Sequence, residues 1–172
     1  FIGPSSNHIK MMGNKIEAKK IMNNNMIPTV PGLEDISDLK KIKNFINEIG
    51  LPIIIKAASG GGGKGMRVVN NLEDLEKSIE SAKIESKKSF NDDTVYIEKF
   101  LLNPKHIEIQ ILSDSNGNVL TLGERDCSIQ RKHQKLIEES PSTSLSNEDR
   151  KEISELCKKA IKSINYEGVG TL

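Results

Sequence analysis

Four consecutive glycines, a lysine and a further glycine occupy positions 60–65 of this sequence. Because glycine has no Cβ, successive backbone N–H groups can approach an anion closely and form a concave nest for phosphate oxygens. Apolar segments flank the run, residues 51–57 before it and residues 66–69 after it. The pattern predicts a glycine-rich loop that joins two strands and covers the phosphates of a nucleotide.

Two phosphate-binding motifs do not fit this loop. Gly60, Gly62 and Gly65 have the spacing of the dinucleotide-binding motif, but that motif must open a helix, whereas residues 66–69 are typical of a strand. A P-loop requires Ser or Thr after its Gly-Lys pair, and this chain has Gly65 there. An ordinary surface hairpin is the alternative, although four glycines exceed what a two-residue or three-residue turn requires.

Lys56 ends the apolar run that leads into the loop. A lysine in a buried strand needs a partner for its charge, and a phosphate would be such a partner. Lys64, near the tip of the loop, is typical of a solvated surface lysine. Lys56 therefore strengthens the prediction of a phosphate site.

A second group of polar residues lies further along the chain. His106, Glu108 and Gln110 alternate with isoleucines, so in a strand they share one face. Such a row suits sugar hydroxyls or an adenine edge, although alternating polar residues are also the ordinary solvent face of a sheet. Residues 124–139 are dense in ionisable and amide side chains without helical periodicity, which favours a loop of the site.

Metal and thiol chemistry have weaker support. His106 and His133 lack the paired spacing of zinc ligands. A nucleophilic pair of Cys127 and His133 is conceivable but ranks below nucleotide binding. Cys157 lies on the apolar stripe of an expected helix, which predicts that it is buried.

Hydrophobic periodicity predicts the elements that would position these residues. The expected helices cover residues 9–24, 39–49, 72–82 and 147–164. Gly50 should end the second helix, and Ser146 with Asp149 should form a capping box for the last. The expected strands cover residues 51–57, 66–69, 94–100, 106–110 and 119–124, with a two-residue hairpin turn at Asn116-Gly117 before the last of them.

These elements indicate an α+β fold with a small lobe of hairpin and helices and part of a larger antiparallel lobe. Prolines and polar turns divide the chain into a helical lead-in over residues 1–27, a lid subdomain with the glycine-rich loop over residues 28–100, and the first part of a second subdomain over residues 101–172.

Composition restricts the classes of function. The 172 residues have a formal net charge of +1, no Trp, two Tyr and four Phe, which offers neither a basic field nor stacking platforms for nucleic acid. Two cysteines without ligand spacing fit free thiols in a reducing, cytosol-like compartment. No apolar stretch reaches the length of a membrane span. The start without Met and the end within an apolar segment lead us to expect a fragment of a larger enzyme.

Six segments, in this order, resemble biotin carboxylase. They are Phe1-Ile-Gly-Pro-Ser, Met12-Gly-Asn-Lys15, Ile54-Ile-Lys-Ala57 with Gly60-Gly-Gly-Gly-Lys-Gly-Met-Arg67, Tyr96-Ile-Glu-Lys99, Pro104-Lys-His-Ile-Glu-Ile-Gln110 and Glu124-Arg-Asp-Cys-Ser-Ile-Gln-Arg-Lys-His-Gln-Lys135. Biotin carboxylase is an ATP-grasp enzyme. The resemblance spans nearly the whole chain and implies two α+β lobes that hold ATP, with the glycine hairpin as a lid.

The resemblance also implies roles for individual residues. Lys15 and Lys56 would bind phosphate, Gly62 and Gly63 would lie in the closing loop, and Lys135 would be catalytic beside bicarbonate or the γ-phosphate. The residues expected to meet the adenine, the ribose and the adjoining site are Glu98, Lys99, Phe100, Leu101, His106, Gln130 and His133.

In this family, ATP and bicarbonate give carboxyphosphate, and its CO2 is captured by the deprotonated ureido nitrogen of biotin on a carrier protein. The sequence of residues 60–69 and 123–135 most resembles that of the biotin carboxylase subunit of bacterial or plastid acetyl-CoA carboxylase, an enzyme of fatty acid synthesis. Propionyl-CoA, methylcrotonyl-CoA and pyruvate carboxylases stay open. So do another bicarbonate-using ATP-grasp enzyme, such as carbamoyl-phosphate synthetase, and a non-catalytic ATP-binding module.

The remaining expectations concern the larger enzyme. Its Mg²⁺ ligands should lie beyond residue 172, so no metal ligand is assigned within the chain. The full-length protein should be a homodimer in the cytoplasm or the plastid stroma, and this chain alone should bind nucleotide weakly and be inactive.

Overall fold

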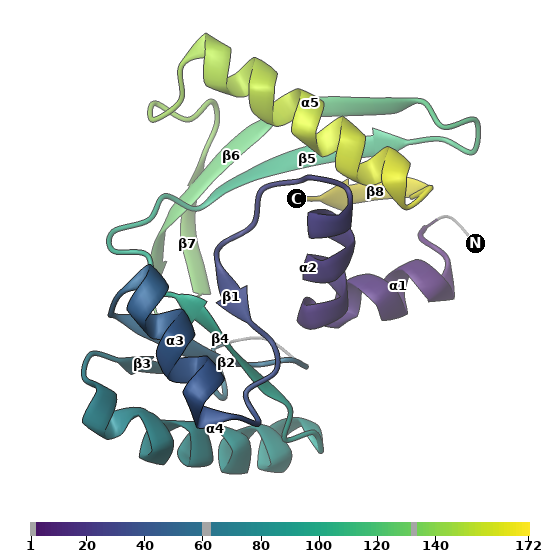
Figure 1. Ribbon diagram of the computed structural model, residues 1–172. Helices are drawn as coiled ribbons and strands as arrows, with labels where there is room; N and C mark the ends of the chain where they lie inside the picture. Colours follow the sequence, from purple (N-terminus) through teal and green to yellow (C-terminus); the bar gives the residue numbers. More distant parts are fainter. Residues whose placement is uncertain (1–2, 60–62, 132–133) are drawn as a thin grey trace. The chain divides into compact units, whose positions relative to one another are not determined.

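The computed structural model describes residues 3–59, 63–131 and 134–172, whose helices and strands are drawn in Figure 1. The chain divides into two compact units. Unit 1 contains residues 1–12, 20–28 and 103–172, and unit 2 contains residues 13–19 and 29–102. Residues 1–28, most of which form the lead-in expected from the sequence, are thus shared between the two units.

Unit 2 is a four-stranded antiparallel sheet with helices on one face. Its elements are β1 (Gly32–Leu33), α3 (Leu39–Ile49), β2 (Ile53–Ala57), β3 (Arg67–Val69), a 3-10 turn (Leu72–Asp74), α4 (Leu75–Phe90) and β4 (Val95–Lys99). The strand order is β1-β4-β2-β3. Side chains from α3, α4 and the three longer strands form one hydrophobic core, and Figure 1 shows both helices beside the sheet.

Strand β2 explains how this sheet positions polar residues. Ile53 and Ile55 are fully buried in the core beneath the helices. Side chains alternate along a strand, so Lys56 lies on the opposite face. Strand pairing places Lys56 opposite Tyr96 and Ile54 opposite Glu98. The lysine and the carboxylate therefore share the face that the two helices leave uncovered.

Local capping signals fix the helix ends in unit 2. The Asp38 side chain accepts a hydrogen bond from the backbone N–H of Lys40, and Gly50, with φ 74°, donates its N–H to the carbonyl of Ile46. The predicted end of this helix at Gly50 is confirmed. The 72–82 helix extends further than expected, to Phe90, where Asn91 ends it in a left-handed conformation.

The single helix expected over residues 9–24 is wrong. Two helices cover this region, α1 (Ser6–Gly13) and α2 (Lys15–Asn24). The side chain of Asn14 accepts hydrogen bonds from the backbone N–H groups of Ile16 and Glu17. Asn14 thus acts as an N-cap and starts a second helix, which the apolar periodicity alone does not indicate.

Unit 1 contains the second antiparallel sheet, with strand order β7-β6-β5-β8. Its further elements are β5 (Ile107–Ser113), β6 (Val119–Arg131), β7 (Gln134–Glu139), α5 (Asn147–Ser163) and β8 (Gly168–Thr171). Helix α5 lies across β5 and β6 (Figure 1), and its Cys157 and Ile161 pack on Ile109 and Ile111. The predicted capping box between Ser146 and Asp149 is present at its N-terminus.

The hairpin of β5 and β6 differs from the sequence prediction. Residues 114–118 form its loop rather than a two-residue turn, because the Asp114 carboxylate accepts hydrogen bonds from the backbone N–H groups of Asn116 and Asn118. Strand β6 is also longer than the 119–124 segment expected, since it continues to Arg131.

A β-bulge interrupts the β5–β6 pairing. Ile111 lies opposite Thr121, whereas Ile109 lies opposite Glu124, so β6 contains one more residue than β5 in this interval. Gly123 in the bulge has φ 91°, a conformation that glycine adopts readily. Beyond the bulge, Glu108 is paired with Arg125.

Both cysteines are free thiols, as the sequence indicates, and the predicted burial of Cys157 is confirmed; Cys127 is buried as well. Among the described helices, none combines enough length and apolar character to cross a membrane.

Candidate functional site

The candidate residues fall into two groups, one in each unit. Unit 2 contains Lys15, Lys56, Glu98 and the described part of the glycine loop, and unit 1 contains His106, Gln130 and Lys135. Gly62 and His133 lie outside the described residues.

In unit 2, Glu98 binds two lysines. Its Oε2 lies 2.5 Å from the Nζ of Lys56, and its Oε1 lies 2.7 Å from the Nζ of Lys19. The side chains of Lys19 and Glu98 are each 10% exposed, and that of Lys56 is 29% exposed. Burial opposes ionisation of Glu98, but the hydrogen bonds and charges of the two lysines outweigh it and lower its pKa. The carboxylate is therefore ionised at neutral pH.

The positive charge of Lys56 has a partner within the protein. The sequence predicts a phosphate as the partner of a buried lysine, but Glu98 already compensates that charge. Burial of Lys56 alone thus does not indicate a phosphate. No local pattern in the sequence indicates Lys19, which approaches Glu98 from helix α2 although 79 residues separate them in the chain.

Lys15 adds a third ammonium group to this cluster. Its Nζ donates to the carbonyl of Ala57 at 3.1 Å, and its backbone N–H donates to the carbonyl of Ala58 at 3.3 Å. These contacts hold Lys15 at the end of β2, where the glycine loop begins. Burial, and next the positive charge of Lys56, lower the pKa of Lys15, against the opposing effect of Glu98. Three ammonium groups thus gather beside Glu98, and such a concentration of positive charge suits an anion.

The described part of the glycine loop leads into a strand. Gly63 and Gly65 have φ 76° and 68°, and β3 follows at Arg67. The absence of a helix after this loop confirms the argument against a dinucleotide-binding motif. A Cβ on Gly65 would lie 3.0 Å from the Cβ of Ala57, so the loop end approaches β2 closely.

We predict that Gly65→Ala destabilises the chain more than Gly117→Ala. Both positions have a positive φ, which costs alanine about 1 kcal/mol. A Cβ at Gly117 meets no atom within 4 Å, whereas one at Gly65 must displace Ala57, which should cost about 1 kcal/mol more. Urea unfolding followed by circular dichroism measures the difference. Equal losses in the two variants would show that the close approach at Gly65 does not matter.

The segment after β4 is held by its own hydrogen bonds. The Lys99 ammonium donates to the carbonyls of Gly50 and Leu51, each at 3.1 Å. The backbone N–H of Lys99 donates to Pro31, and that of Phe100 donates to Pro52. Because the Lys99 ammonium already donates to these backbone carbonyls, an adenine contact at this segment would rely on backbone groups. Leu101 is 47% exposed.

Unit 1 contains a buried carboxylate between two cations. Glu108 is 6% exposed. Its Oε1 lies 2.8 Å from the Nε and 2.5 Å from the Nη2 of Arg125, and its Oε2 accepts a hydrogen bond from the Nζ of Lys135. The Lys135 hydrogen bond, and then Arg125, lower the pKa of Glu108 against the effect of burial. Glu108 in turn raises the pKa of Lys135.

His106 and Gln130 are brought together beside this network. The Gln130 amide nitrogen lies 2.8 Å from Nδ1 of His106 and donates to the carbonyl of Cys127 at 2.9 Å. The alternative that residues 106–110 form an ordinary solvent face is wrong for Glu108, which is buried. Their shared polar face is confirmed for Glu108 and Gln110, since both contact Arg125.

The loop expected over residues 124–139 is wrong, because β6 and β7 cover most of it. Both faces of β6 are polar here. Arg125 contacts Glu108 on one face, whereas Glu124 binds Arg150 of α5 on the other, at 2.6 Å. A strand with charges on both faces lacks the apolar alternation by which strands are recognised. Arg125 was overlooked for the same reason.

Cys127 does not resemble a nucleophile. Its side chain is fully buried, and burial, then the charge of Glu108, raise the pKa of its thiol. A reactive cysteine needs a lowered pKa and access to its substrate.

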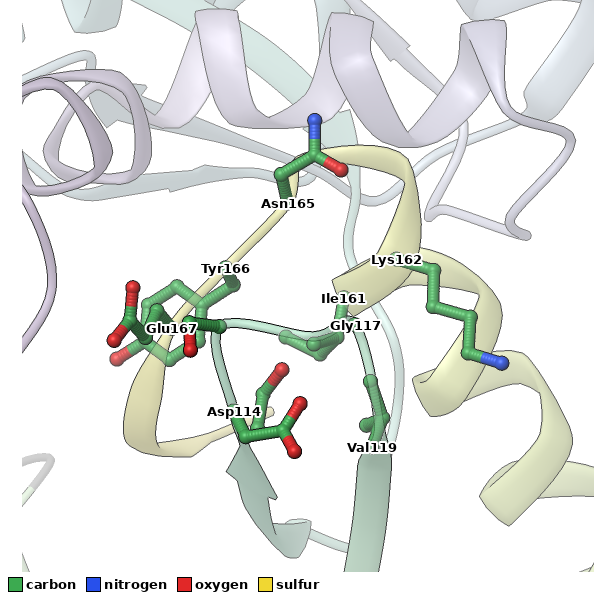
Figure 2. Close-up of a pocket in the computed structure, with 10 residues that line it drawn as sticks. Asp114, Gly117, Val119, Ile161, Lys162, Asn165, Tyr166 and Glu167 are labelled. Atoms are coloured by element: carbon green, nitrogen blue, oxygen red, sulfur yellow. The ribbon is translucent and has the colours of Figure 1, made fainter.

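A separate cavity of about 330 Å³ lies between the β5–β6 loop and the end of α5. Figure 2 shows Asp114 and Glu167 beside it, with Lys162 directed away from both. Two carboxylates disfavour a phosphate, so this cavity is not the predicted nucleotide site.

Comparison with known proteins identifies the family. Residues 14–172 match the family described as "Carbamoyl-phosphate synthase L chain, ATP binding domain". The chain is 49% identical over 173 residues to a biotin carboxylase of Haemophilus influenzae, which covers 99% of the chain and 39% of that protein. It is also 49% identical over 174 residues to the methylcrotonoyl-CoA carboxylase subunit alpha of Dictyostelium discoideum, covering 100% of the chain and 25% of that protein.

Solved structures agree in fold. The biotin carboxylase of Campylobacter jejuni, crystallised as a "beta-gamma-ATP complex", has a TM-score of 0.94 and 49% identity, covering 99% of this chain and 39% of its own. The biotin carboxylase domain of Hydrogenobacter thermophilus 2-oxoglutarate carboxylase has a TM-score of 0.91 and 45% identity, covering 99% and 38%. The α+β, ATP-grasp prediction is confirmed. The chain belongs to the carbamoyl-phosphate synthase L chain ATP-binding family, and within it to the biotin carboxylase ATP-binding domains.

Proposed function

We propose that this chain forms the nucleotide-binding part of an enzyme that carboxylates biotin on a carrier protein, with ATP and bicarbonate as co-substrates. The observation that carries the proposal is the gathering of Lys15, Lys19 and Lys56 beside Glu98, at the strand end that leads into the glycine loop. Positive charge held in this way stabilises a phosphoryl group during transfer. The chain spans between about one third and two fifths of the biotin carboxylases that it matches. The activity of the whole enzyme is therefore proposed as well.

The chemistry divides between the two groups of residues. Lys15 and Lys56 bind the nucleotide phosphates, with Gly62 and Gly63 in the closing loop. Lys135 carries the ammonium group that attracts bicarbonate or the γ-phosphate. Attack of a bicarbonate oxygen on the γ-phosphorus releases ADP and forms carboxyphosphate. Carboxyphosphate then breaks down to CO2 and inorganic phosphate, and the CO2 bonds to the ureido nitrogen of biotin, whose proton passes to the phosphate.

The base and ribose would contact the remaining candidates. Glu98, Lys99, Phe100 and Leu101 follow one another along the chain at the end of β4 and would meet the adenine through backbone groups. The ribose and the adjoining site would be reached by His106, Gln130 and His133. The contact between His106 and Gln130 supports a shared role for these two.

Magnesium does not fit the acidic cluster that the described residues offer. Glu108, Cys127 and Glu138 have ligand atoms within 4.8 Å of one another, but Glu108 is already bound by Lys135 and Arg125. A buried thiol is also a poor ligand for Mg²⁺, which prefers oxygen. One solved relative is described with MgADP and bicarbonate. We therefore propose that Mg²⁺ accompanies ATP here with ligands outside residues 1–172.

We propose acetyl-CoA carboxylase, and with it fatty acid synthesis, as the context of this activity. Bacterial and chloroplastic biotin carboxylases are 45–49% identical to the chain, which supports a cytoplasmic or plastid location. A methylcrotonoyl-CoA carboxylase subunit reaches 49% and a pyruvate carboxylase 46%, so propionyl-CoA, methylcrotonyl-CoA and pyruvate carboxylases are the alternatives. A solved relative is described as a dimer, which supports a homodimeric parent protein.

The test of the proposal uses the natural polypeptide that carries residues 1–172. Purified with a biotinylated carrier domain, it should form carboxybiotin from ATP and labelled bicarbonate and release one ADP for each carboxyl group. Tight ATP binding without bicarbonate-dependent turnover would favour a non-catalytic ATP-binding module instead. Residues 1–172 alone should bind nucleotide weakly and show no biotin-dependent ATP hydrolysis.

We predict that Lys56→Ala weakens ATP binding by about 10-fold to 100-fold, because it removes a charge-assisted contact worth about 1.5–3 kcal/mol. Glu98 also binds Lys19, at 2.7 Å, so it should retain a partner in this variant and the fold should persist. Calorimetric titration with a non-hydrolysable ATP analogue measures the change. Lys41→Ala, which removes an exposed lysine paired with Asp35, is the matched control and should bind normally. An unchanged affinity of Lys56→Ala for the ATP analogue would show that Lys56 does not bind the phosphates.

A further inference from the structure

Glu108 is a buried carboxylate that has no role in the reaction proposed above. We propose that Glu108, anchored by Arg125, is a positioning residue that fixes the ammonium group of Lys135 toward its anionic substrate. The inference rests on the proposed function, because it concerns the residue proposed to attract bicarbonate or the γ-phosphate.

The two oxygens of Glu108 have separate partners. Oε1 accepts hydrogen bonds from Arg125, and Oε2 accepts one from Lys135. The three residues come from neighbouring strands, Glu108 from β5, Arg125 from β6 and Lys135 from β7. Glu108 and Arg125 are directly paired across the β5–β6 ladder. Each oxygen is thus held in place by a different cation.

Arg125 is itself held from several directions. Its Nη1 donates to the Gln110 amide oxygen at 3.0 Å, its Nη2 lies 3.4 Å from the Thr171 hydroxyl, and its Nε lies 3.5 Å from the Glu138 carboxylate. A guanidinium with this many partners loses little further freedom when it orients a carboxylate. Contacts with β5, β7 and β8 therefore fix the Arg125 guanidinium, and the guanidinium in turn fixes Glu108.

Lys135 needs such an anchor. A lysine side chain has many rotamers, and its side chain here is 37% exposed, so without a partner it would sample positions away from the substrate. One hydrogen bond to Glu108 directs the ammonium and leaves two of its three N–H donors for an anion. The titratable groups that act on Lys135 are Glu108, Glu138 and the Cys127 thiol, and both carboxylates also bind Arg125. Glu108 is the one carboxylate bonded to Lys135 among the described residues.

The chain supplies a matched control on the opposite face of the same hairpin. Glu124 is also 6% exposed and also binds an arginine, with its Oε1 2.6 Å from the Nε of Arg150. Its partners lie on α5 and in the loop around Ser142. Glu108→Gln and Glu124→Gln thus make the same chemical change at equal burial, but only the first affects Lys135.

The kinetic test compares these variants in the natural polypeptide. Glu108→Gln should lower kcat/KM for bicarbonate by 10-fold to 100-fold, with ATP affinity within twofold of the wild type. Glu124→Gln should leave both within twofold. Glu108→Asp, which retains the charge but shortens the side chain, should recover part of the loss. A Glu108→Gln enzyme no more impaired than Glu124→Gln would overturn the inference.

A second measurement is independent of turnover. In residues 1–172 carrying ¹³C-dimethylated lysines, the Lys135 resonance should titrate at lower pH in Glu108→Gln than in the wild type, and at its normal pH in Glu124→Gln. If the wild-type enzyme shows no bicarbonate-dependent turnover, the proposed function fails, while this titration still decides whether Glu108 holds Lys135. An unchanged Lys135 titration in a folded Glu108→Gln chain would refute the contact itself.

Discussion

Lys135→Ala is expected to lower bicarbonate-dependent ATP turnover by about 10²-fold to 10³-fold, which is the usual cost of removing one group that stabilises charge in a transition state. Its ammonium is bonded to the buried Glu108 carboxylate, which keeps it protonated at neutral pH. ADP release measured at saturating ATP, with and without bicarbonate and free biotin, gives the turnover.

The fold should survive this substitution, because Glu108 retains Arg125 as a partner. Lys158→Ala is a suitable control, since Lys158 belongs to a surface pair with Glu155 on α5. Its turnover should equal that of the wild type. If Lys135→Ala kept its rate within threefold, Lys135 would have no part in the chemistry, and the anion would have to be held by another group.

Glu98→Ala is expected to destabilise unit 2 by about 3 kcal/mol, the lower end of the range for breaking a buried ion pair. The variant leaves Lys19, whose side chain is 10% exposed, and Lys56 without their carboxylate. Partial exposure of Lys56 reduces the cost, because water can solvate it. Urea unfolding of the chain measures the loss. Glu155→Ala, which breaks an exposed pair on α5, should change stability by less than about 0.5 kcal/mol.

The stabilisation from Glu98 should also depend on pH. Its folded-state pKa lies below the usual value, chiefly because the hydrogen bonds from Lys19 and Lys56 outweigh burial. A carboxyl with a lowered pKa stabilises the fold above its unfolded-state pKa, about 4.3, and loses this contribution as the pH falls through its folded-state pKa. The stability difference between the wild type and Glu98→Gln should therefore shrink in acid. A constant difference between pH 7 and pH 3 would contradict this account.

Local signals predicted the helices and strands best. Gly50 and the Ser146–Asp149 capping box mark ends that depend only on residues a few positions apart. The prediction of a strand on either side of the glycine loop is also confirmed. Short runs of isoleucine and valine are typical of strands, so their residue types alone indicate the element. Asn14 shows the limit of this approach, since one side-chain cap divided an apolar stripe that is continuous in the sequence.

The partners in the candidate site could not be predicted from the sequence. Lys19 of α2 binds Glu98 of β4 across 79 positions of the chain, and no local pattern encodes that approach. Likewise, the sequence predicts a ligand as the partner of Lys56, whereas its partner is Glu98 on the paired strand β4. The residue types thus identify the chemistry, but the pairing of strands determines which charges are already compensated.

Strand pairing also gives the β-bulge at Gly123 a consequence for insertions and deletions. From the hairpin loop, the ladder pairs Ser113 with Val119, and the same register continued without the bulge would set Glu108 opposite Glu124. Two carboxylates would then face each other, and Arg125 would point toward α5. Loss of one residue from the interval 122–123 would remove the bulge but keep Glu108 opposite Arg125, whereas closing the bulge without such a loss would reverse the face of every residue that follows in β6. In this hairpin, chain length carries as much information as the identity of the side chains.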